Sequence, residues 1–199
     1  MNGRISGFAS HGVNAREYAH IRNVVAVSNG GWGIKVRHRA VVVESTGSEN
    51  VVGIGAADGS VVARNVAYGN SVDWIIASSG SSIVGNSSYD NGDDGIEAGT
   101  SCVVRDNAVW SNGDDGIDAE NGSVVSDNAT RDNTGNGITA CLSLVRANAA
   151  TNNGGYGLEF LCPGGSYREN LIEGNTMGIV NGSATNAGAN VCNGSLTCP

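Results

Sequence analysis

The chain has 199 residues, enough for one domain with a sizeable core, and its formal net charge is −8. It holds 31 glycines, 2 prolines and 5% aromatic residues, with ample valine, isoleucine and alanine, which excludes collagen-like and disordered chains. Only 11 residues are basic, and no apolar run is long enough to span a bilayer, so we expect neither a nucleic acid nor a membrane as partner.

A glycine followed by an aliphatic residue recurs from the beginning of the chain in steps of 20 or 21 residues. The pairs are Gly12-Val13, Gly33-Ile34, Gly53-Ile54, Gly95-Ile96, Gly116-Ile117, Gly137-Ile138, Gly157-Leu158 and Gly178-Ile179, and Trp74-Ile75 fills the one gap. Two residues after each aliphatic residue stands another small or apolar one, from Ala15 to Phe160. This alternation indicates a strand with both side chains pointing inward.

A second strand is expected before a recurring asparagine. This asparagine is Asn65, Asn86, Asn107, Asn128 and Asn148, with Asn23 and Asn170 extending the series, and another follows five residues later at Asn70, Asn91, Asn112, Asn133, Asn153 and Asn175. Stacking equal coils pairs each strand with its copy about 4.8 Å away and aligns the asparagines in columns that hydrogen-bond along the stack. We therefore predict an all-β fold, a right-handed parallel β-helix of about nine coils over residues 1–181, followed by a capping tail at 182–199.

The pattern Val-x-x-Asn-x-x-x-x-Asn-x-x-x-Gly-Ile-x-Ala resembles the right-handed β-helix repeat of the pectin-lyase-like superfamily. Polysaccharide is the commonest partner across that superfamily, so the resemblance implies a carbohydrate ligand. The superfamily includes lyases, hydrolases, epimerases, phage tailspikes and adhesins, and therefore the resemblance does not select one activity.

Two near-identical segments, NGDDGIEAG and NGDDGIDAE, place six acidic side chains on adjacent coils. These are Asp93, Asp94, Glu97, Asp114, Asp115 and Asp118, and Asp73 stands one repeat earlier. Carboxylates about 5 Å apart repel by roughly 1 kcal/mol in water and by more where water is partly excluded. Three explanations remain open: the carboxylates bind a Ca²⁺ ion, they catalyse a reaction, or they are repeated Asp-Gly turns.

The catalytic explanation follows from a similarity to polygalacturonase-type glycosidases. Asp94 and the pair Asp114 and Asp115 match the placement of that family's acidic residues on two successive coils. The similarity implies inverting hydrolysis, which needs two carboxyl groups about 6.5–9.5 Å apart. Asn136 replaces the family's histidine, and the coil expected to hold Arg-x-Lys reads YGLEFL. Two of the four catalytic elements are therefore missing, and a lyase fits less well still.

Three aromatic residues and one arginine recur three residues after the asparagine column, namely Tyr68, Tyr89, Trp110 and Arg131. Alternation predicts that these four side chains point outward. They either stack sugar faces, with Arg131 binding a sugar carboxylate, or cover a sheet face, or form a protein interface.

Six of the 11 basic residues lie before residue 40. They include Lys35, Arg37 and Arg39, with Arg16 and Arg22 on the preceding coil. This basic region is either a solvated face or a binding surface for an anionic polysaccharide.

The five cysteines suggest at least one disulfide. Cys192 and Cys198 enclose a short loop and are expected to pair. Cys141 and Cys162 lie one repeat apart, so they either bridge adjacent coils or remain buried thiols. Cys102 is left without a partner if they pair and is then expected to be a buried thiol. A disulfide favours an extracellular or periplasmic protein, although no secretory signal is present in this sequence.

The N-terminal end of the rod needs a cover, because an open coil exposes unpaired backbone. We expect a homo-oligomer partner or a missing N-terminal segment to supply it. The leading hypothesis is a secreted β-helix that binds a polysaccharide, with Ca²⁺ as its candidate cofactor and without a complete catalytic set. A polysaccharide hydrolase or lyase and a structural spike or adhesin shaft are the alternatives.

Overall fold

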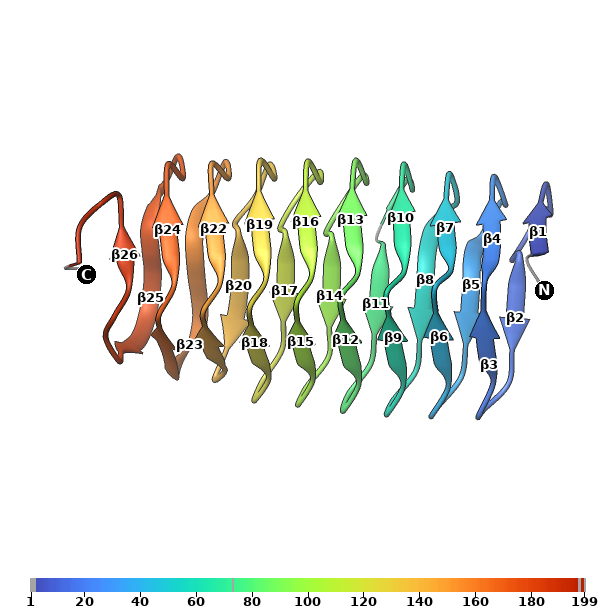
Figure 1. Ribbon diagram of the computed structural model, residues 1–199, viewed down its shortest axis with the longest axis horizontal. Helices are drawn as coiled ribbons and strands as arrows, with labels where there is room; N and C mark the ends of the chain where they lie inside the picture. The colour runs from blue at the N-terminus through green and yellow to red at the C-terminus, as the bar shows by residue number, and fades with distance from the viewer. Residues whose placement is uncertain (1–2, 73, 197, 199) are drawn as a thin grey trace.

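A computed structural model describes residues 3–72, 74–196 and 198 of the chain. Within these residues the protein is all β and winds about nine times around one axis. Figure 1 shows the coils stacked side by side into a rod with the two termini at opposite ends. None of the described residues belongs to a helix long and apolar enough to cross a bilayer. The predicted fold class is confirmed.

Most coils contain three short strands separated by corners, so the rod has three faces. The first face contains β2 (Val13–Ala15), β5 (Trp32–Val36), β8 (Val52–Ala56), β11 (Ile75–Ala77), β14 (Ile96–Ala98), β17 (Ile117–Ala119), β20 (Ile138–Cys141), the start of β23 (Tyr156–Arg168) and β25 (Gly178–Asn186). The second contains β3 (His20–Arg22), β6 (Val41–Val43), β9 (Val61–Ala63), β12 (Ser82–Val84), β15 (Val103–Arg105), β18 (Val124–Ser126), β21 (Leu144–Arg146) and the end of β23, with which the end of β25 pairs. The third contains β1 (Gly3–Ser6), β4 (Val24–Val27), β7 (Thr46–Ser48), β10 (Val66–Tyr68), β13 (Ser87–Tyr89), β16 (Ala108–Trp110), β19 (Ala129–Arg131), β22 (Ala149–Thr151), β24 (Leu171–Glu173) and β26 (Val191–Cys192).

All strand pairs between coils are parallel and join like residues of successive repeats. The third face is a 10-stranded sheet, whereas the first and second faces form one 16-stranded sheet. They are continuous because β23 does not break at the corner: its first part pairs with β20 and its last part with β21. This long strand ties two faces together near the C-terminal end.

The core consists of inward columns of identical or similar side chains. The largest is fully buried and contains Ile34, Ile54, Ile75, Ile96, Ile117, Ile138 and Leu158. The predicted second column is buried from Val36 to Phe160, while Ala15 on the first complete coil is only half-buried. Burial of each large aliphatic side chain contributes about 1.5–3 kcal/mol, so the repeated column is the main source of stability.

Two asparagine ladders run inside the corners and confirm the predicted columns. The backbone N–H and Nδ2 of Asn86 both donate to Oδ1 of Asn107, at 2.9 and 3.0 Å, and Nδ2 also donates to the Val62 carbonyl at 3.0 Å. The same pattern links the first ladder from Asn65 to Asn190 and the second from Asn29 to Asn175. Each buried amide is thereby satisfied, as burial of a polar group requires.

Asn23 was predicted to extend the first ladder, and this prediction is wrong. The register pairs Val25 with Thr46, so Val24 stacks on Ser45, and the Val24 N–H donates to Ser45 Oγ at 3.2 Å. Asn23 lies one residue earlier, at the corner, with φ of 55°. Asparagine tolerates this left-handed conformation, which explains its presence there. Asn170, at the other end of the series, is confirmed as a rung.

The disulfide between Cys192 and Cys198 is present as predicted. Cys141 and Cys162 also form a disulfide, which joins β20 to β23, and Cys102 is a buried free cysteine. The open question of these three cysteines is thus resolved in favour of one bridge between coils.

The C-terminal region keeps the solenoid geometry for longer than the expected boundary. β25 runs through the 181/182 position to Asn186, and β26 pairs with β24 as a further strand of the third face. Asn190 continues the first ladder 20 residues after Asn170. This spacing was the sequence signal that the solenoid continues.

Candidate functional site

The six acidic residues lie on the coils of β14 and β17, four of them where the chain turns from the third face into the first and two within the strands. We call Asp93, Asp94, Glu97, Asp114, Asp115 and Asp118 the acidic cluster. The coils stack closely here, since a Cβ at Gly113 would lie 2.2 Å from the Gly92 carbonyl oxygen. Glu97 in β14 and Asp118 in β17 are paired in register, so their side chains project side by side. Asp73 lies outside the described residues.

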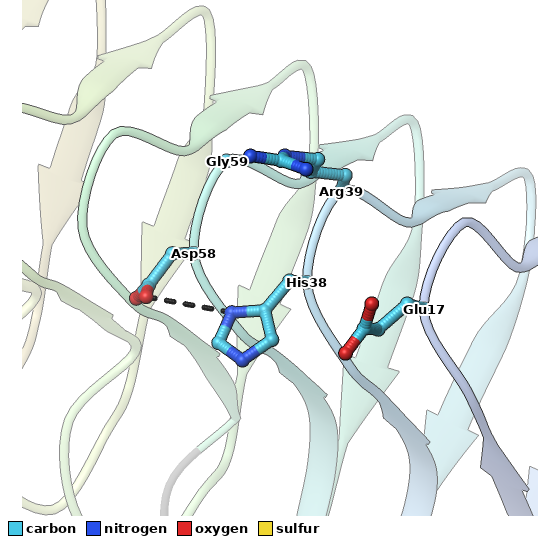
Figure 2. Close-up of a pocket in the computed structure, with 5 residues that line it drawn as sticks. All are labelled: Glu17, His38, Arg39, Asp58 and Gly59. Carbon is cyan, nitrogen blue, oxygen red and sulfur yellow. Dashed lines mark ion pairs between the residues drawn. The ribbon is translucent and has the colours of Figure 1, made fainter.

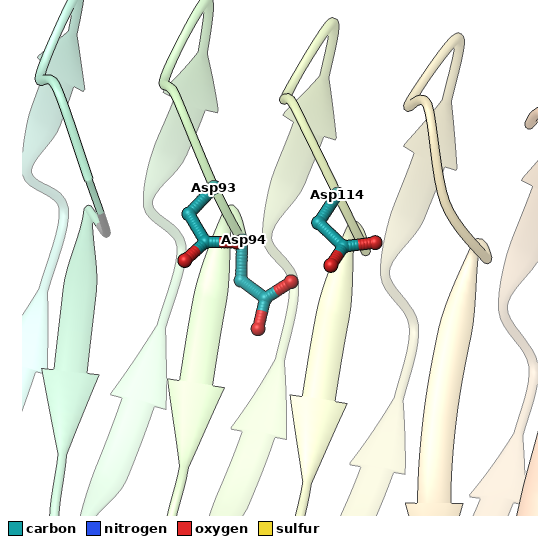
Figure 3. A group of neighbouring side chains, drawn as sticks. All are labelled: Asp93, Asp94 and Asp114. Atoms are coloured by element: carbon teal, nitrogen blue, oxygen red, sulfur yellow. The ribbon is translucent and has the colours of Figure 1, made fainter.

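Three members of the acidic cluster meet closely enough to share a cation. One carboxylate oxygen each from Asp93, Asp94 and Asp114 lies within 4.8 Å of the others. Figure 3 shows Asp93 and Asp94 on one coil and Asp114 on the next. Three converging oxygens supply part of the six to eight that Ca²⁺ prefers. The predicted metal ligands Glu97, Asp115 and Asp118 are not in this group.

Asp94 and Asp115 also form a small ladder with the backbone. The Asp115 N–H donates to Asp94 Oδ1 at 2.8 Å, and the Asn136 N–H donates to Asp115 Oδ1 at 2.6 Å. Asn136 continues the series by accepting the Tyr156 N–H at 2.7 Å. These carboxylates therefore have a structural task in addition to any function.

Burial and crowding shift the protonation of the acidic cluster. Burial raises the pKa of Asp94 to about 8, and the charges of Asp115, Asp118 and Asp114 add to this effect, while the hydrogen bond from the Asp115 N–H opposes it. Burial raises the pKa of Asp118 to about 6, again with help from Asp115. The pKa of Asp114 is raised for the same two reasons. Asp94 is therefore largely protonated at neutral pH.

A hydrogen-bonded network continues from the acidic cluster toward the C-terminal coils. The Thr139 hydroxyl donates to Asp115 Oδ2 at 2.5 Å. Asn136 Nδ2 donates to Thr139 Oγ1 at 3.1 Å and to Glu159 Oε2 at 2.8 Å, and Asn181 Nδ2 donates to Glu159 Oε1 at 2.7 Å. Sequence reasoning did not single out Thr139, Glu159 and Asn181. Their one-repeat spacing from Asp118 was the signal for them.

The catalytic prediction required two carboxyl groups far enough apart to admit a water molecule. Asp94 and Asp114 present oxygens within 4.8 Å of each other, so these two atoms are close enough to share a cation. Asp94 and Asp115 are linked through the Asp115 backbone. The catalytic role of Asp94, Asp114 and Asp115 therefore stays a prediction.

The four predicted ligand-binding side chains stack on one another along the third face. Tyr68 and Tyr89 have ring centroids 5.2 Å apart, and Tyr89 and Trp110 are 4.6 Å apart, both nearly parallel at 8°. The Arg131 guanidinium lies 5.3 Å from the Trp110 ring centroid and also bonds Asp132. The ring faces between these residues are covered by their neighbours. This geometry favours the ladder that shields a sheet face over an open platform for sugar rings.

The basic region forms hollows at the N-terminal end of the first face. A cavity of about 610 Å³ is lined by Asn14, Arg16, Glu17 and Arg37. A second, of about 370 Å³, is lined by Glu17, His38, Arg39, Asp58 and Gly59 and is drawn in Figure 2. A third, of about 190 Å³, extends past Trp32 and Lys35 to the β11 coil.

No family model matches the sequence, and no curated protein matches it significantly. The three-dimensional structure, by contrast, belongs to a known fold, the right-handed parallel β-helix.

Solved structures with this fold include two modules from Azotobacter vinelandii and one periplasmic enzyme. The A-module of mannuronan C-5 epimerase AlgE4 has a TM-score of 0.74 and 19% identity over 86% of this chain. The A-module of AlgE6 has a TM-score of 0.58 and 16% identity over 87%. The periplasmic alginate epimerase AlgG has a TM-score of 0.65 and 19% identity over 85%.

The present chain spans 58%, 62% and 57% of those three chains, which is less than two-thirds of each. At these identities the likeness shows a shared fold.

Proposed function

We propose that this chain binds a polysaccharide along the outer surface of the first face. The observation that carries the proposal is a row of hydrogen-bonding side chains on five consecutive coils. The row consists of Glu97, Asp118, Thr139, Glu159 and Asn181, paired in register. Thr139 is buried and binds Asp115, whereas Glu97, Asp118, Glu159 and Asn181 are exposed or half-buried. With coils about 4.8 Å apart, these four side chains can contact successive units of a hydroxylated polymer. Carboxylates accept hydrogen bonds from sugar hydroxyls, and amides and hydroxyls also donate.

The structural neighbours support this proposal because they are epimerases of the polysaccharides alginate and mannuronan. The two disulfides and the periplasmic location of AlgG support an extracellular or periplasmic location for this chain as well.

Affinity electrophoresis against a panel of neutral glucans, pectins and alginates tests the proposal. The chain should be retarded by at least one polymer. The variants Asp118→Ala and Glu159→Ala should each weaken retention about tenfold, equivalent to the loss of a hydrogen bond to a charged group. Glu173→Ala on the third face, which removes the same charge, should leave retention unchanged.

Retention by no polymer, with the fold intact by circular dichroism, would contradict polysaccharide binding. That result would favour the alternative hypothesis that the chain is a structural shaft and that the row of side chains only stabilises the stack.

We further propose that Asp93, Asp94 and Asp114 bind a Ca²⁺ ion. Their converging oxygens support the site, and a divalent cation would offset the repulsion among stacked carboxylates. Added Ca²⁺ should raise the melting temperature at pH 8, and EGTA should reverse the rise. Asp114→Asn should abolish the Ca²⁺ effect, whereas Asp132→Asn, a charge-matched change on the third face, should not. A melting temperature that ignores Ca²⁺ would contradict this site.

A hydrolase or lyase using Asp94, Asp114 and Asp115 is the second candidate. It is favoured by Asp94, whose pKa burial raises to about 8, beside a second carboxyl group, Asp115, which accepts hydrogen bonds from the Asn136 N–H and the Thr139 hydroxyl. A carboxyl group that stays protonated near neutral pH can act as a general acid. Turnover of a retained polymer, lost in both Asp94→Asn and Asp115→Asn, would establish the enzyme. Absence of product from every polymer of the panel would exclude it.

A further inference from the structure

We propose that the N-terminal coils contain a binding pocket for the carboxylate of a uronate, a carboxylate-bearing sugar unit, centred on Arg16 and Arg37. The inference rests on the proposed polysaccharide binding and names the charge of the polymer. It places the recognition of that charge about four coils away from the acidic cluster.

Two adjacent coils build the pocket. The register pairs Ala15 with Val36, so the next residues, Arg16 and Arg37, leave the strands side by side. Both are exposed and line the cavity of about 610 Å³ together with Asn14 and Glu17. This volume lies in the range of small-molecule sites.

The two guanidinium groups have no carboxylate partner in ion-pair contact within the described part of the chain. Other arginines do: Arg22 and Arg64 pair with Glu44, while Arg105 and Arg131 pair with the aspartates that follow them. Neighbouring like charges repel, and an anion between them relieves the repulsion. A guanidinium fork binds the two oxygens of a carboxylate in one plane, and a uronate is the sugar unit that carries a carboxylate.

The groups beside the arginines are those that recognise the rest of a sugar. Asn14, in register with Lys35, offers an amide that can donate to and accept from hydroxyls. Farther along the same face the Trp32 ring covers Gly55, where a Cβ would lie 1.5 Å from the nearest ring atom. Lys35 Nζ lies 4.6 Å from the centroid of that ring. A polymer held at the arginines therefore continues over an aromatic and cationic surface.

Among the described residues that line the pocket, Glu17 is the one with a carboxylate, and it opposes an anionic ligand. It also lines the cavity in Figure 2, where His38 lies between Glu17 and Asp58 and is 3.4 Å from the Asp58 carboxylate. Removing the charge of Glu17 should therefore tighten binding, which gives the proposal a test of opposite sign.

Isothermal titration with oligouronates prepared from alginate and from pectin tests the pocket. Arg16→Gln and Arg37→Gln should each raise the dissociation constant at least tenfold and reduce its dependence on salt, whereas Glu17→Gln should lower the constant. Arg168→Gln removes the same charge from an exposed position on β23 and should change little. Oligomers whose carboxyl groups have been reduced to alcohols should bind at least tenfold more weakly than the parent oligomers.

Three results would overturn the pocket: equal affinity for the reduced oligomers, unchanged affinity in both arginine variants, or equally tight binding of a sulfated oligosaccharide without carboxylates. In each case, neutral-polymer retention that is lost in Asp118→Ala would leave the proposed polysaccharide binding in place. The two proposals can therefore fail separately.

Discussion

Cys102 occupies a position that is serine on neighbouring coils. The serine hydroxyls of this column accept backbone N–H groups from the preceding coil: Ser60 N–H donates to Ser81 Oγ at 3.2 Å, and Cys102 N–H donates to Ser123 Oγ at 3.1 Å. The Cys102 thiol itself lies 3.3 Å from the Ser78 carbonyl oxygen.

We expect Cys102→Ser to change the free energy of unfolding by no more than about 1 kcal/mol, because the column is built for a hydroxyl. Cys102→Val should cost about 1–3 kcal/mol, since it leaves buried backbone groups unpaired. Urea unfolding of both variants measures the difference. A serine variant as unstable as the valine variant would show that the column does not act through hydrogen bonds.

Asn107 tests the ladder in the middle of the rod. Its Oδ1 accepts two hydrogen bonds from Asn86, and its Nδ2 donates to Asn128 and to the Ile83 carbonyl. Asn107→Ala leaves several buried groups unpaired, and at about 1–3 kcal/mol for each we expect a loss of at least 3 kcal/mol in urea unfolding. The exposed Asn121→Ala on the same coil should cost less than about 0.5 kcal/mol.

Site residues could be predicted from the sequence where they recur at the repeat spacing. They were missed where a side chain contacts a neighbouring coil. Asp93, Asp94 and Asp114 were found because two NGDDGI segments are in register. The Trp32 ring over Gly55 was missed, since the contact depends on a rotamer that reaches across to the next coil.

At the scale of one element, the two NGDDGI turns make stability depend on pH. The pKa of Asp94 rises from 3.8 to about 8 on folding, and that of Asp118 rises from 3.8 to about 6. The folded chain therefore binds more protons than the unfolded chain between about pH 4 and pH 8. The stability that these two groups contribute is complete below about pH 4 and is lost as the pH rises through about 6 and 8.

We expect the melting temperature, measured in EGTA, to fall from pH 5 to pH 9. Asp94→Asn keeps an oxygen acceptor for the Asp115 N–H and should flatten this fall while raising the melting temperature at pH 8. Asp132→Asn, on the third face, should leave the slope unchanged. A melting temperature that rises from pH 5 to pH 9 would contradict the raised pKa values.

The aromatic stack is an element of the third face whose role can be separated from binding. Trp110 contacts Tyr89 on one side and Arg131 on the other. Trp110→Ala should lower the free energy of unfolding by about 1–3 kcal/mol through lost ring contacts and buried area. Retention by polysaccharides should be unchanged if the stack only covers the sheet, and weakened if it contacts sugar, so one variant decides between the two predictions.

Across the whole molecule, the fold was predictable because every coil repeats one set of constraints. An inward isoleucine, a buried asparagine and a tight corner recur at the same spacing, and together they fix both the register and the number of coils. The charge distribution along the rod followed directly, since residue number is proportional to distance along the axis. The C-terminal region was harder, because β23 departs from the repeat with an irregular register between Phe160 and Gly165.

The unbroken course of β23 has a consequence for local unfolding. A solenoid coil contacts only its neighbours, so its ends can fray one coil at a time. Near the C-terminal end, however, β23 belongs to two faces at once, and the Cys141–Cys162 bridge holds it to the preceding coil. These coils should open as a unit. The protection of amide hydrogens from exchange should therefore fall gradually from the centre toward the N-terminal coils, but in one step on either side of β23.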